Sequence, residues 1–325
     1  MANLHSLFRD LESNINLSPT RKKNIERGRD ALREKISDNF QEKNRNKPKY
    51  CMQGSYAMRT AITPLENKEF DLDNGVYLQG YSEDQESWPT TTLVHTWVEN
   101  AVDGHTDTPP VDKNTCIRVI YKDDYHIDLP IYIMGVENIE GEEQQVAYLA
   151  HKTNGWVISD PKAFTDWFIK KVNEHGEQLR RIVKYMKSWK DNKNIDLKGI
   201  AITILVCNHF SGKEQRDDIA LLDTITNILD EIEDNFHCFK PVTPKDEDLF
   251  ANISYTKQQD IIKKLNNLKQ KLDQAIYQEK NQKKSSEIIQ KEFGDRFPLG
   301  KDEEEDSFAT TDSPVSLGGH NSHFA

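Results

Sequence analysis

The sequence lacks the features that mark secreted, membrane-spanning and zinc-binding proteins. Its four cysteines are widely spaced and form no C-x-x-C pair, which predicts reduced thiols in place of a disulfide framework or a zinc knuckle: Cys51, Cys116, Cys207 and Cys238. The first residues, MANLHSLFRDLE, have neither a cationic start nor an apolar segment and predict no signal peptide. The longest apolar run, IAITILVC, is too short to cross a bilayer. We therefore expect a cytoplasmic protein with no membrane partner.

Positive charge is also scarce. The chain has 43 Lys and Arg residues against 54 Asp and Glu residues, a formal net charge of −11. A duplex-binding protein needs net positive charge on its contact face, so this balance argues against dedicated DNA binding. A local basic cleft for a small anionic ligand remains compatible with it.

The 325 residues suit one bilobal unit or two domains. Up to about residue 158, helical and strand patterns are interleaved; from about 160 the patterns are helical. Helices are predicted at 2–14, 19–39, 90–103, 160–174, 176–190, 197–210, 217–234, 255–282 and 284–293, a strand-turn unit at 49–57, and strand segments at 69–78 and 114–134. The first region would be a core with N-terminal helices (1–158) and the second a helical lobe (159–300). The acidic, then Ser/Gly-rich end (301–325) predicts a disordered tail.

Three aspartates lie in apolar β-type segments. In EFDLDNGVYL, apolar residues alternate with Asp71 and Asp73, so both carboxylates share one face, about 7 Å apart along the backbone. Asp128 lies in YHIDLPIYI, where an unpaired charge would be costly. Carboxylates held this close repel one another unless a proton or a cation joins them, and Mg²⁺ prefers such hard oxygen ligands. The trio is suited to two metal ions, one clamping a triphosphate and one activating a hydroxyl.

The turn QGSYA supplies a second element. Gly54 allows close backbone approach to a phosphate, and backbone N–H groups with the Ser55 hydroxyl can bind phosphate oxygens; Gln53 precedes them. Taken alone, a Gly-Ser pair is usually only a turn, and a D-x-D is usually the surface end of a strand. Their spacing, together with a third aspartate on a later apolar strand, favours the functional interpretation.

The segments GSYAMRTAITP, EFDLDNGVYL and YHIDLPIYI resemble the nucleotidyltransferases related to DNA polymerase β. Within these, the chain is similar to the bacterial cGAS/DncV-like nucleotidyltransferases (CD-NTases), the signal-making enzymes of CBASS antiphage operons. The similarity extends over most of residues 40–300, through NGWVISDPKAFTDWF, LRRIVKYMKSWKD, FKPVTPKDEDLF and FGDRFP.

This resemblance implies a bilobal α+β polymerase β-like fold, in which a small mixed sheet and N-terminal helices pack against a C-terminal helical lobe. It implies synthesis of a cyclic di- or trinucleotide from NTPs such as ATP and GTP, with pyrophosphate release and with Mg²⁺ or Mn²⁺ as cofactor. Asp71, Asp73 and Asp128 match the metal-binding catalytic residues, and Gly54 and Ser55 match the phosphate-binding motif.

Cationic residues on the predicted helix 176–190 form a further candidate site. Arg180, Lys184 and Lys187 share one face and are candidates to bind the donor triphosphate, although a solvated helix face is an equally good interpretation. The resemblance places a phosphate-binding lysine at Lys187, and Ser188 is a weaker candidate. For His126, a structural role is at least as well supported as a place in the pocket.

Several alternatives stay open. The same triad would serve a template-independent RNA-tailing enzyme, although the negative net charge does not suggest an RNA track, and the fold would serve a catalytically silent nucleotide sensor. The resemblance implies a downstream effector activated by the cyclic nucleotide. It also offers a role for the tail, in which an E1/E2-like conjugation enzyme acts on the carboxylate of Ala325; an unconstrained terminus is the alternative.

Overall fold

The computed structural model describes residues 2–66, 69–122, 125–139 and 141–302. The helices are α1 (His5–Ile15), α2 (Pro19–Glu42), α3 (Gly54–Ala57), α4 (Thr91–Val102), α5 (Pro161–His175), α6 (Glu177–Asn192), α7 (Gly199–His209), α8 (Asp217–Ile232), α9 (Tyr255–Asp273) and α10 (Gln282–Phe293). The strands are β1 (Lys49–Gln53), β2 (Phe70–Tyr77), β3 (Val111–Asp112), β4 (Ile117–Tyr121), β5 (Tyr125–Leu129), β6 (Ile131–Ile139), β7 (Glu142–His151) and β8 (Gly155–Ile158). From residue 303 on, the predicted tail lies outside the described residues.

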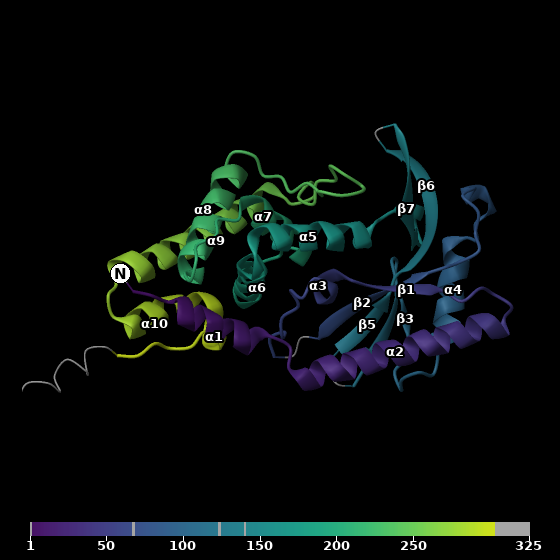
Figure 1. The fold of residues 1–325 in the computed structure, drawn as a ribbon, viewed down its shortest axis with the longest axis horizontal. Coiled ribbons are helices and arrows are strands. Elements are labelled where there is room, and N and C mark those ends of the chain that lie inside the picture. The colour runs from purple at the N-terminus through teal and green to yellow at the C-terminus, as the bar shows by residue number, and fades with distance from the viewer. Residues whose placement is uncertain (1, 67–68, 123–124, 140, 303–325) are drawn as a thin grey trace, which may run out of the picture.

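The strands form one mixed, eight-stranded sheet in the order β3-β4-β5-β2-β6-β7-β8, with β1 pairing to β2 beside this path. Strand β2 is central: it runs antiparallel to β1 and parallel to both β5 and β6. The predicted hairpin at 114–134 is present as the antiparallel pair β4 and β5, and Pro130 separates β5 from β6. Figure 1 shows the sheet on one side of the molecule and the helices α5–α10 on the other, the bilobal α+β arrangement that the sequence predicted.

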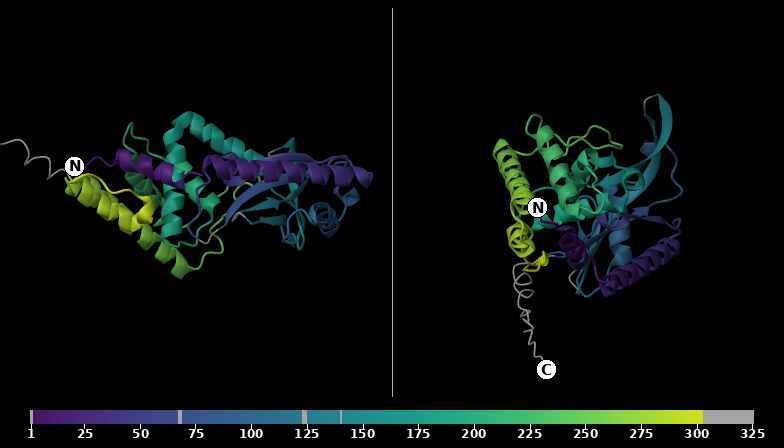
Figure 2. Two further views of the ribbon diagram at one scale, coloured as in Figure 1. Left: turned by 90° about the horizontal axis from the view of Figure 1, so that it is seen from below. Right: turned by 60° about the vertical axis from the view of Figure 1, so that its left-hand side comes forward.

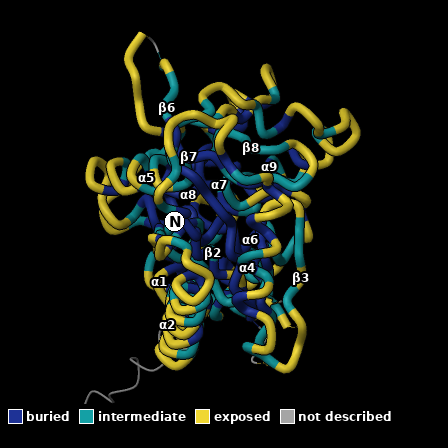
Figure 3. Tube along the Cα trace, turned by 90° about the vertical axis from the view of Figure 1, so that its right-hand side faces the viewer, coloured by how far each residue is buried: buried dark blue, intermediate teal, exposed yellow. Residues whose placement is uncertain are grey.

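One hydrophobic core lies between the sheet and the helices α2 and α4. It joins Leu32 and Ile36 of α2 and Val94 and Val98 of α4 to apolar residues of the sheet such as Leu72. These helix residues recur at spacings of four, so each helix turns a single apolar stripe toward the strands. The opposite face of α2 is exposed, as the tube in Figure 3 shows.

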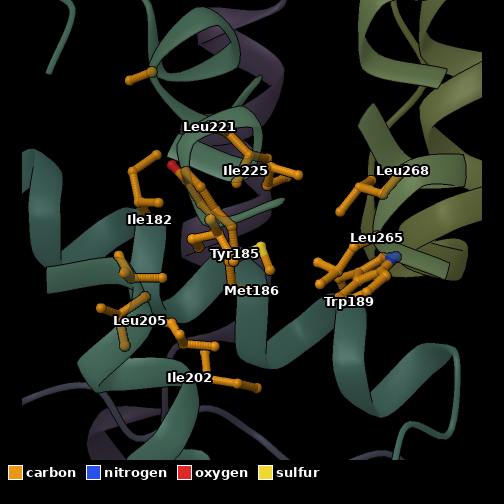
Figure 4. Packing of buried hydrophobic residues seen from close by; sticks show 14 of the residues in the cluster. Ile182, Tyr185, Met186, Trp189, Ile202, Leu205, Leu221, Ile225, Leu265 and Leu268 are labelled. Carbon is orange, nitrogen blue, oxygen red and sulfur yellow. The ribbon is translucent and has the colours of Figure 1, made fainter. Parts of the chain in front are cut away.

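A second core lies within the helical lobe. Tyr185 and Trp189 of α6 are fully buried among apolar residues of α7, α8 and α9, as Figure 4 shows. The first helix joins this core: Phe8 of α1 packs against the rings of Tyr185 and Phe293. Helices α1 and α2 therefore follow one another along the molecule but bury their apolar faces in different cores (Figure 2). The domain boundary at 158/159 stays a prediction.

The polar residues at the helix starts explain where several helices begin. Ser18 accepts a hydrogen bond from the backbone N–H of Arg21 ahead of α2, and Asp160 caps α5 in the same way; a proline follows each cap. Both starts were predicted. The long helix predicted at 255–282 is shorter, because α9 ends at Asp273 and continues as a π-helical turn over Gln274–Gln278. Among the described residues, no helix is long and apolar enough to span a membrane.

Candidate functional site

Strands β2 and β5 bring the three predicted aspartates together. The parallel register pairs Asp73 with Asp128 and Asp71 with His126, so the D-x-D of one strand lies directly beside the single aspartate of the other. Asp71 is exposed, Asp73 half-buried and Asp128 buried. All three carboxylate-bearing residues line the same cleft, as the triad hypothesis requires.

Burial and crowding change the acidity of Asp73. Burial, followed by the charges of Asp71 and Asp128, raises the pKa of the Asp73 carboxyl to about 7. A carboxyl in such a position either keeps its proton near neutral pH or is compensated by a cation. The donor chemistry of the trio, carboxylate oxygens alone, fits a hard divalent cation such as Mg²⁺ or Mn²⁺.

Arg118 of β4 pairs with the third carboxylate. Its Nε and one terminal nitrogen donate to the two oxygens of Asp128, each at 2.7 Å. With Asp128 held in this way, the described residues contain no set of three His, Cys, Asp or Glu side chains already converged on one point as a metal site. The carboxylates fit a cation by their chemistry and their shared cleft, and Asp128 is oriented by Arg118.

Gly54 lies against the aspartates. A Cβ atom placed on it would come within 2.4 Å of Asp73 Oδ2, and its φ of +65° is a conformation that side chains disfavour. Both observations require glycine where α3 begins. Ser55 follows in the same short helix and lines the cleft, while its carbonyl accepts hydrogen bonds from the backbone N–H groups of Thr60 and Ala61.

The cleft has a volume of about 750 Å³ and is lined by residues of both the sheet and the helical lobe. Besides the aspartates, its charged lining includes Lys187, Lys190 and Asp191 of α6, and Lys240 from the loop after α8. This size and mixed lining suit a nucleotide-sized ligand with negative charge.

Lys187 is the predicted basic residue that reaches this cleft. Its Nζ donates to the hydroxyl of Thr60 at 2.9 Å and contacts the Thr60 carbonyl at 3.3 Å. Burial lowers the pKa of Lys187 to about 8, and the negative charge of Asp71 partly opposes this. The Lys187 ammonium group therefore interacts with Asp71 and loses its charge at a pH near 8.

The other candidates of α6 lie elsewhere. Arg180 donates to the carbonyl of Met58 and pairs with Glu177, and Lys184 is bound by Glu12 and Asn16 of the first helical segment. Neither lines the cleft. The three cationic residues of this face therefore have different surroundings, because α1 covers Lys184 and the segment after α3 covers Arg180. Substrate binding by either residue stays a prediction without support from its position.

Two smaller candidates are also placed away from the cleft lining. Ser188 is completely buried and its hydroxyl has no hydrogen-bond partner among the described residues. His126 shares a strand face with Asp128, and its Nδ1 is bonded to Glu69 at 2.8 Å, which favours the structural interpretation. Gln53 does line the cleft, but its amide is bonded to Tyr77 and Tyr132.

Sequence reasoning missed Arg118, Thr60 and Lys240. A signal existed for the first: Arg118 is the single charged residue in the apolar run IRVIY, which becomes β4. Thr60 and Lys240 lie in loops that carry the family resemblance but have no strand or helix periodicity, so only the packing of the two lobes places them at the cleft.

Comparisons with known proteins agree with this geometry. A family model described as "Cyclic GMP-AMP synthase DncV-like, nucleotidyltransferase domain" matches residues 48–132, and another, "Cyclic GMP-AMP synthase, C-terminal domain", matches residues 176–302. The chain belongs to the DncV-like nucleotidyltransferases. The first match contains Gln53–Ser55, Asp71, Asp73 and Asp128, and the second contains Lys187.

Individual members of the DncV-like family share about a quarter of their aligned residues with this chain. The chain is 26% identical to a cyclic GMP-AMP synthase of Escherichia albertii over 227 residues, which is 63% of this chain and 48% of the relative. It is 27% identical over 187 residues to a cyclic GMP-AMP synthase of Escherichia coli, covering 44% and 42% of the two chains. The chain thus spans about half the length of the curated relatives it matches.

Solved structures establish the DncV-like fold independently. Vibrio cholerae DncV in complex with the linear intermediate pppA(3′,5′)pG superposes with a TM-score of 0.75 at 19% identity, covering 91% of this chain and 97% of that one. The GTP-bound form of the same protein gives a TM-score of 0.75 at 18% identity over 91% and 96%.

Proposed function

We propose that this chain is a cyclic oligonucleotide synthase that joins NTPs with release of pyrophosphate. The observation that carries the proposal is the parallel register of β2 and β5, which sets Asp73 beside Asp128 at the edge of a nucleotide-sized cleft. The names of the curated relatives, cyclic GMP-AMP synthases, support a cyclic dinucleotide as product and ATP and GTP as substrates.

In the proposed reaction, a 3′ or 2′ hydroxyl oxygen of one nucleotide forms a bond to the α-phosphorus of another. The bond from that phosphorus to the bridging oxygen of the leaving pyrophosphate breaks, and the hydroxyl proton passes to a carboxylate, for which Asp128 is the candidate. A second transfer between the ends of the linear product closes the ring.

The residues of the cleft contribute mainly positioning and electrostatics. Asp71, Asp73 and Asp128 would hold the divalent ions, which would stabilise charge on the phosphates as Lewis acids. The backbone around Gly54 and Ser55 would bind terminal phosphate oxygens, and Lys187 would add a positive charge to the lining of the cleft.

The test is turnover by the purified chain. Each pair of labelled NTPs is incubated with Mg²⁺ or Mn²⁺, treated with phosphatase, and the resistant products are separated and weighed by mass spectrometry. A phosphatase-resistant cyclic product that disappears in Asp71→Asn/Asp73→Asn supports the proposal. A ladder of extended RNA would favour the tailing enzyme, and tight NTP binding without turnover would favour the silent sensor.

We further propose that the product serves CBASS antiphage defence through an effector that binds the cyclic nucleotide. This rests on the family, whose signal-making enzymes it resembles, and is tested by phage plating on cells that carry the operon with the native chain or with Asp71→Asn/Asp73→Asn. Equal plating efficiencies would contradict it. Conjugation through Ala325 concerns a residue outside the described ones and stays a prediction.

A further inference from the structure

Gln53 lies at the junction of the sheet and the candidate phosphate-binding turn. It is the last residue of β1, its Cα pairs with that of Asp73 across the strands, and Gly54 follows it directly. Only 3% of Gln53 is exposed. Any shift of this residue would therefore move the turn relative to the aspartates.

Two tyrosines occupy both ends of the Gln53 amide. Nε2 donates to the hydroxyl of Tyr77 at 3.1 Å, and the hydroxyl of Tyr132 donates to Oε1 at 3.2 Å. The two rings come from β2 and β6 and are stacked, with centroids 4.8 Å apart and planes inclined by 18°. Burial raises the pKa of both phenols, so they keep their protons and remain hydrogen-bonding partners at neutral pH.

The amide is also enclosed from the side of Gly75. A Cβ atom on Gly75 would approach Gln53 Nε2 to 2.2 Å, so the amide packs directly on the backbone of β2. To contact a phosphate, the amide would have to leave two hydrogen bonds and expose the buried phenols, which is costly. These contacts argue against the direct substrate-binding role that the sequence suggested for Gln53.

We propose that Gln53 is a positioning residue, and that Tyr77, Gln53 and Tyr132 form a brace that fixes the orientation of the Gly54–Ser55 turn toward the NTP phosphates. The brace rests on the proposed function, since its effect is on NTP use. It acts through the backbone: the tyrosines hold the amide, the amide holds the end of β1, and that end sets where the N–H groups of the turn point.

The experiment measures KM and kcat for NTPs with the full chain and with Tyr132→Phe, Tyr77→Phe and Gln53→Leu. We expect each variant to raise KM by about threefold to tenfold with kcat changed less than about twofold, the range for losing one or two buried hydrogen bonds. The matched control is Tyr148→Phe: Tyr148 is equally buried, lies on β7, and bonds Glu137 outside the cleft lining. Its KM should equal that of the native chain, even if its melting temperature falls as much.

A double variant separates the brace from direct binding. If the three residues act as one unit, Gln53→Leu/Tyr132→Phe raises KM no further than Gln53→Leu alone. A large KM increase in Gln53→Leu with an unchanged KM in both single tyrosine variants would mean that Gln53 binds phosphate itself, and would overturn the inference. Should Tyr132→Phe not fold, Tyr77→Phe gives the same test. A native chain that makes no product and binds no NTP would overturn the proposed function and the brace together.

Discussion

Arg118 and Asp128 face each other across neighbouring strands, and the guanidinium donates to both carboxylate oxygens at 2.7 Å. The pair is largely shielded from water: 23% of the Arg118 side chain and 12% of the Asp128 side chain are exposed. Of the three candidate metal-binding carboxylates, Asp128 is thus the one that forms an ion pair with another side chain among the described residues.

Arg118→Gln should lower the free energy of unfolding by about 2 kcal/mol, because it leaves a buried carboxylate without its charged partner. Mg²⁺ should then raise the melting temperature more in this variant than in the native chain, since the ion replaces the missing positive charge. Thermal unfolding with and without Mg²⁺ measures both effects. The control is Arg29→Gln. Arg29 also donates to both carboxylate oxygens of its partner, Asp30, but 61% of the Asp30 side chain is exposed. This variant should lower the free energy of unfolding by under about 1 kcal/mol. Equal losses in the two variants would contradict the argument.

Gly54→Ala should abolish most of the activity, because its Cβ would collide with the Asp73 carboxylate. The matched control is Gly104→Ala. Gly104 has nearly the same φ, +64° against +65°, but nothing lies within 4 Å of its added Cβ. Both variants carry the backbone strain of about 1 kcal/mol, and the collision with Asp73 lowers the stability of Gly54→Ala further. Only Gly54→Ala should lose activity, by about 100-fold or more. Product formation and unfolding curves distinguish the two, and an active Gly54→Ala enzyme would refute the proposed turn.

Lys187 should impose an upper pH limit on NTP use. Its pKa is lowered to about 8, so the free enzyme loses this positive charge as the pH rises through 8. The value of kcat/KM for NTPs should therefore fall above that pH. In Lys187→Arg the charge persists, and the fall should move to higher pH. A native profile that stays level up to pH 9.5 would show that the Lys187 charge is not used.

Asp73 should make the metal-free protein less stable as the pH rises. The carboxyl has its pKa raised from 3.8 to about 7 in the fold, so between these values the folded state binds more protons than the unfolded state, and stability declines with rising pH. Asp73→Asn should remove this slope and be more stable than the native chain at pH 8 by on the order of 2 kcal/mol. In excess Mg²⁺ the native chain should be the more stable of the two proteins, since only the Asp73 carboxylate, and not the asparagine amide, binds the ion. Denaturant unfolding at pH 4 to 8 in EDTA measures the slope; parallel curves for the two proteins would contradict it.

The sequence alone determined most of the helices, the strands that carry the aspartates and the location of the acidic site, but not the strands β3, β7 and β8. Alternation in EFDLDNGVYL placed Asp71 and Asp73 on one strand face, because side chains in a strand repeat every two residues. Helix starts at Ser18-Pro19 and Asp160-Pro161 followed from capping chemistry. Strand alternation and helix capping depend on residues only a few positions apart, so one sequence is enough to predict them.

Tertiary structure decided which side chains are free to act. Arg180 and Lys184 share a helix face with Lys187. Arg180, however, is bound by Met58 and Glu177, and Lys184 is bound by Glu12 and Asn16. Of the three, Lys187 alone lines the cleft. The pairing of Arg118 with Asp128 and the enclosure of the Gln53 amide likewise depend on partners from other strands. A polar side chain takes its role from the groups that packing brings to it, and contacts between distant segments leave no periodic trace in the sequence.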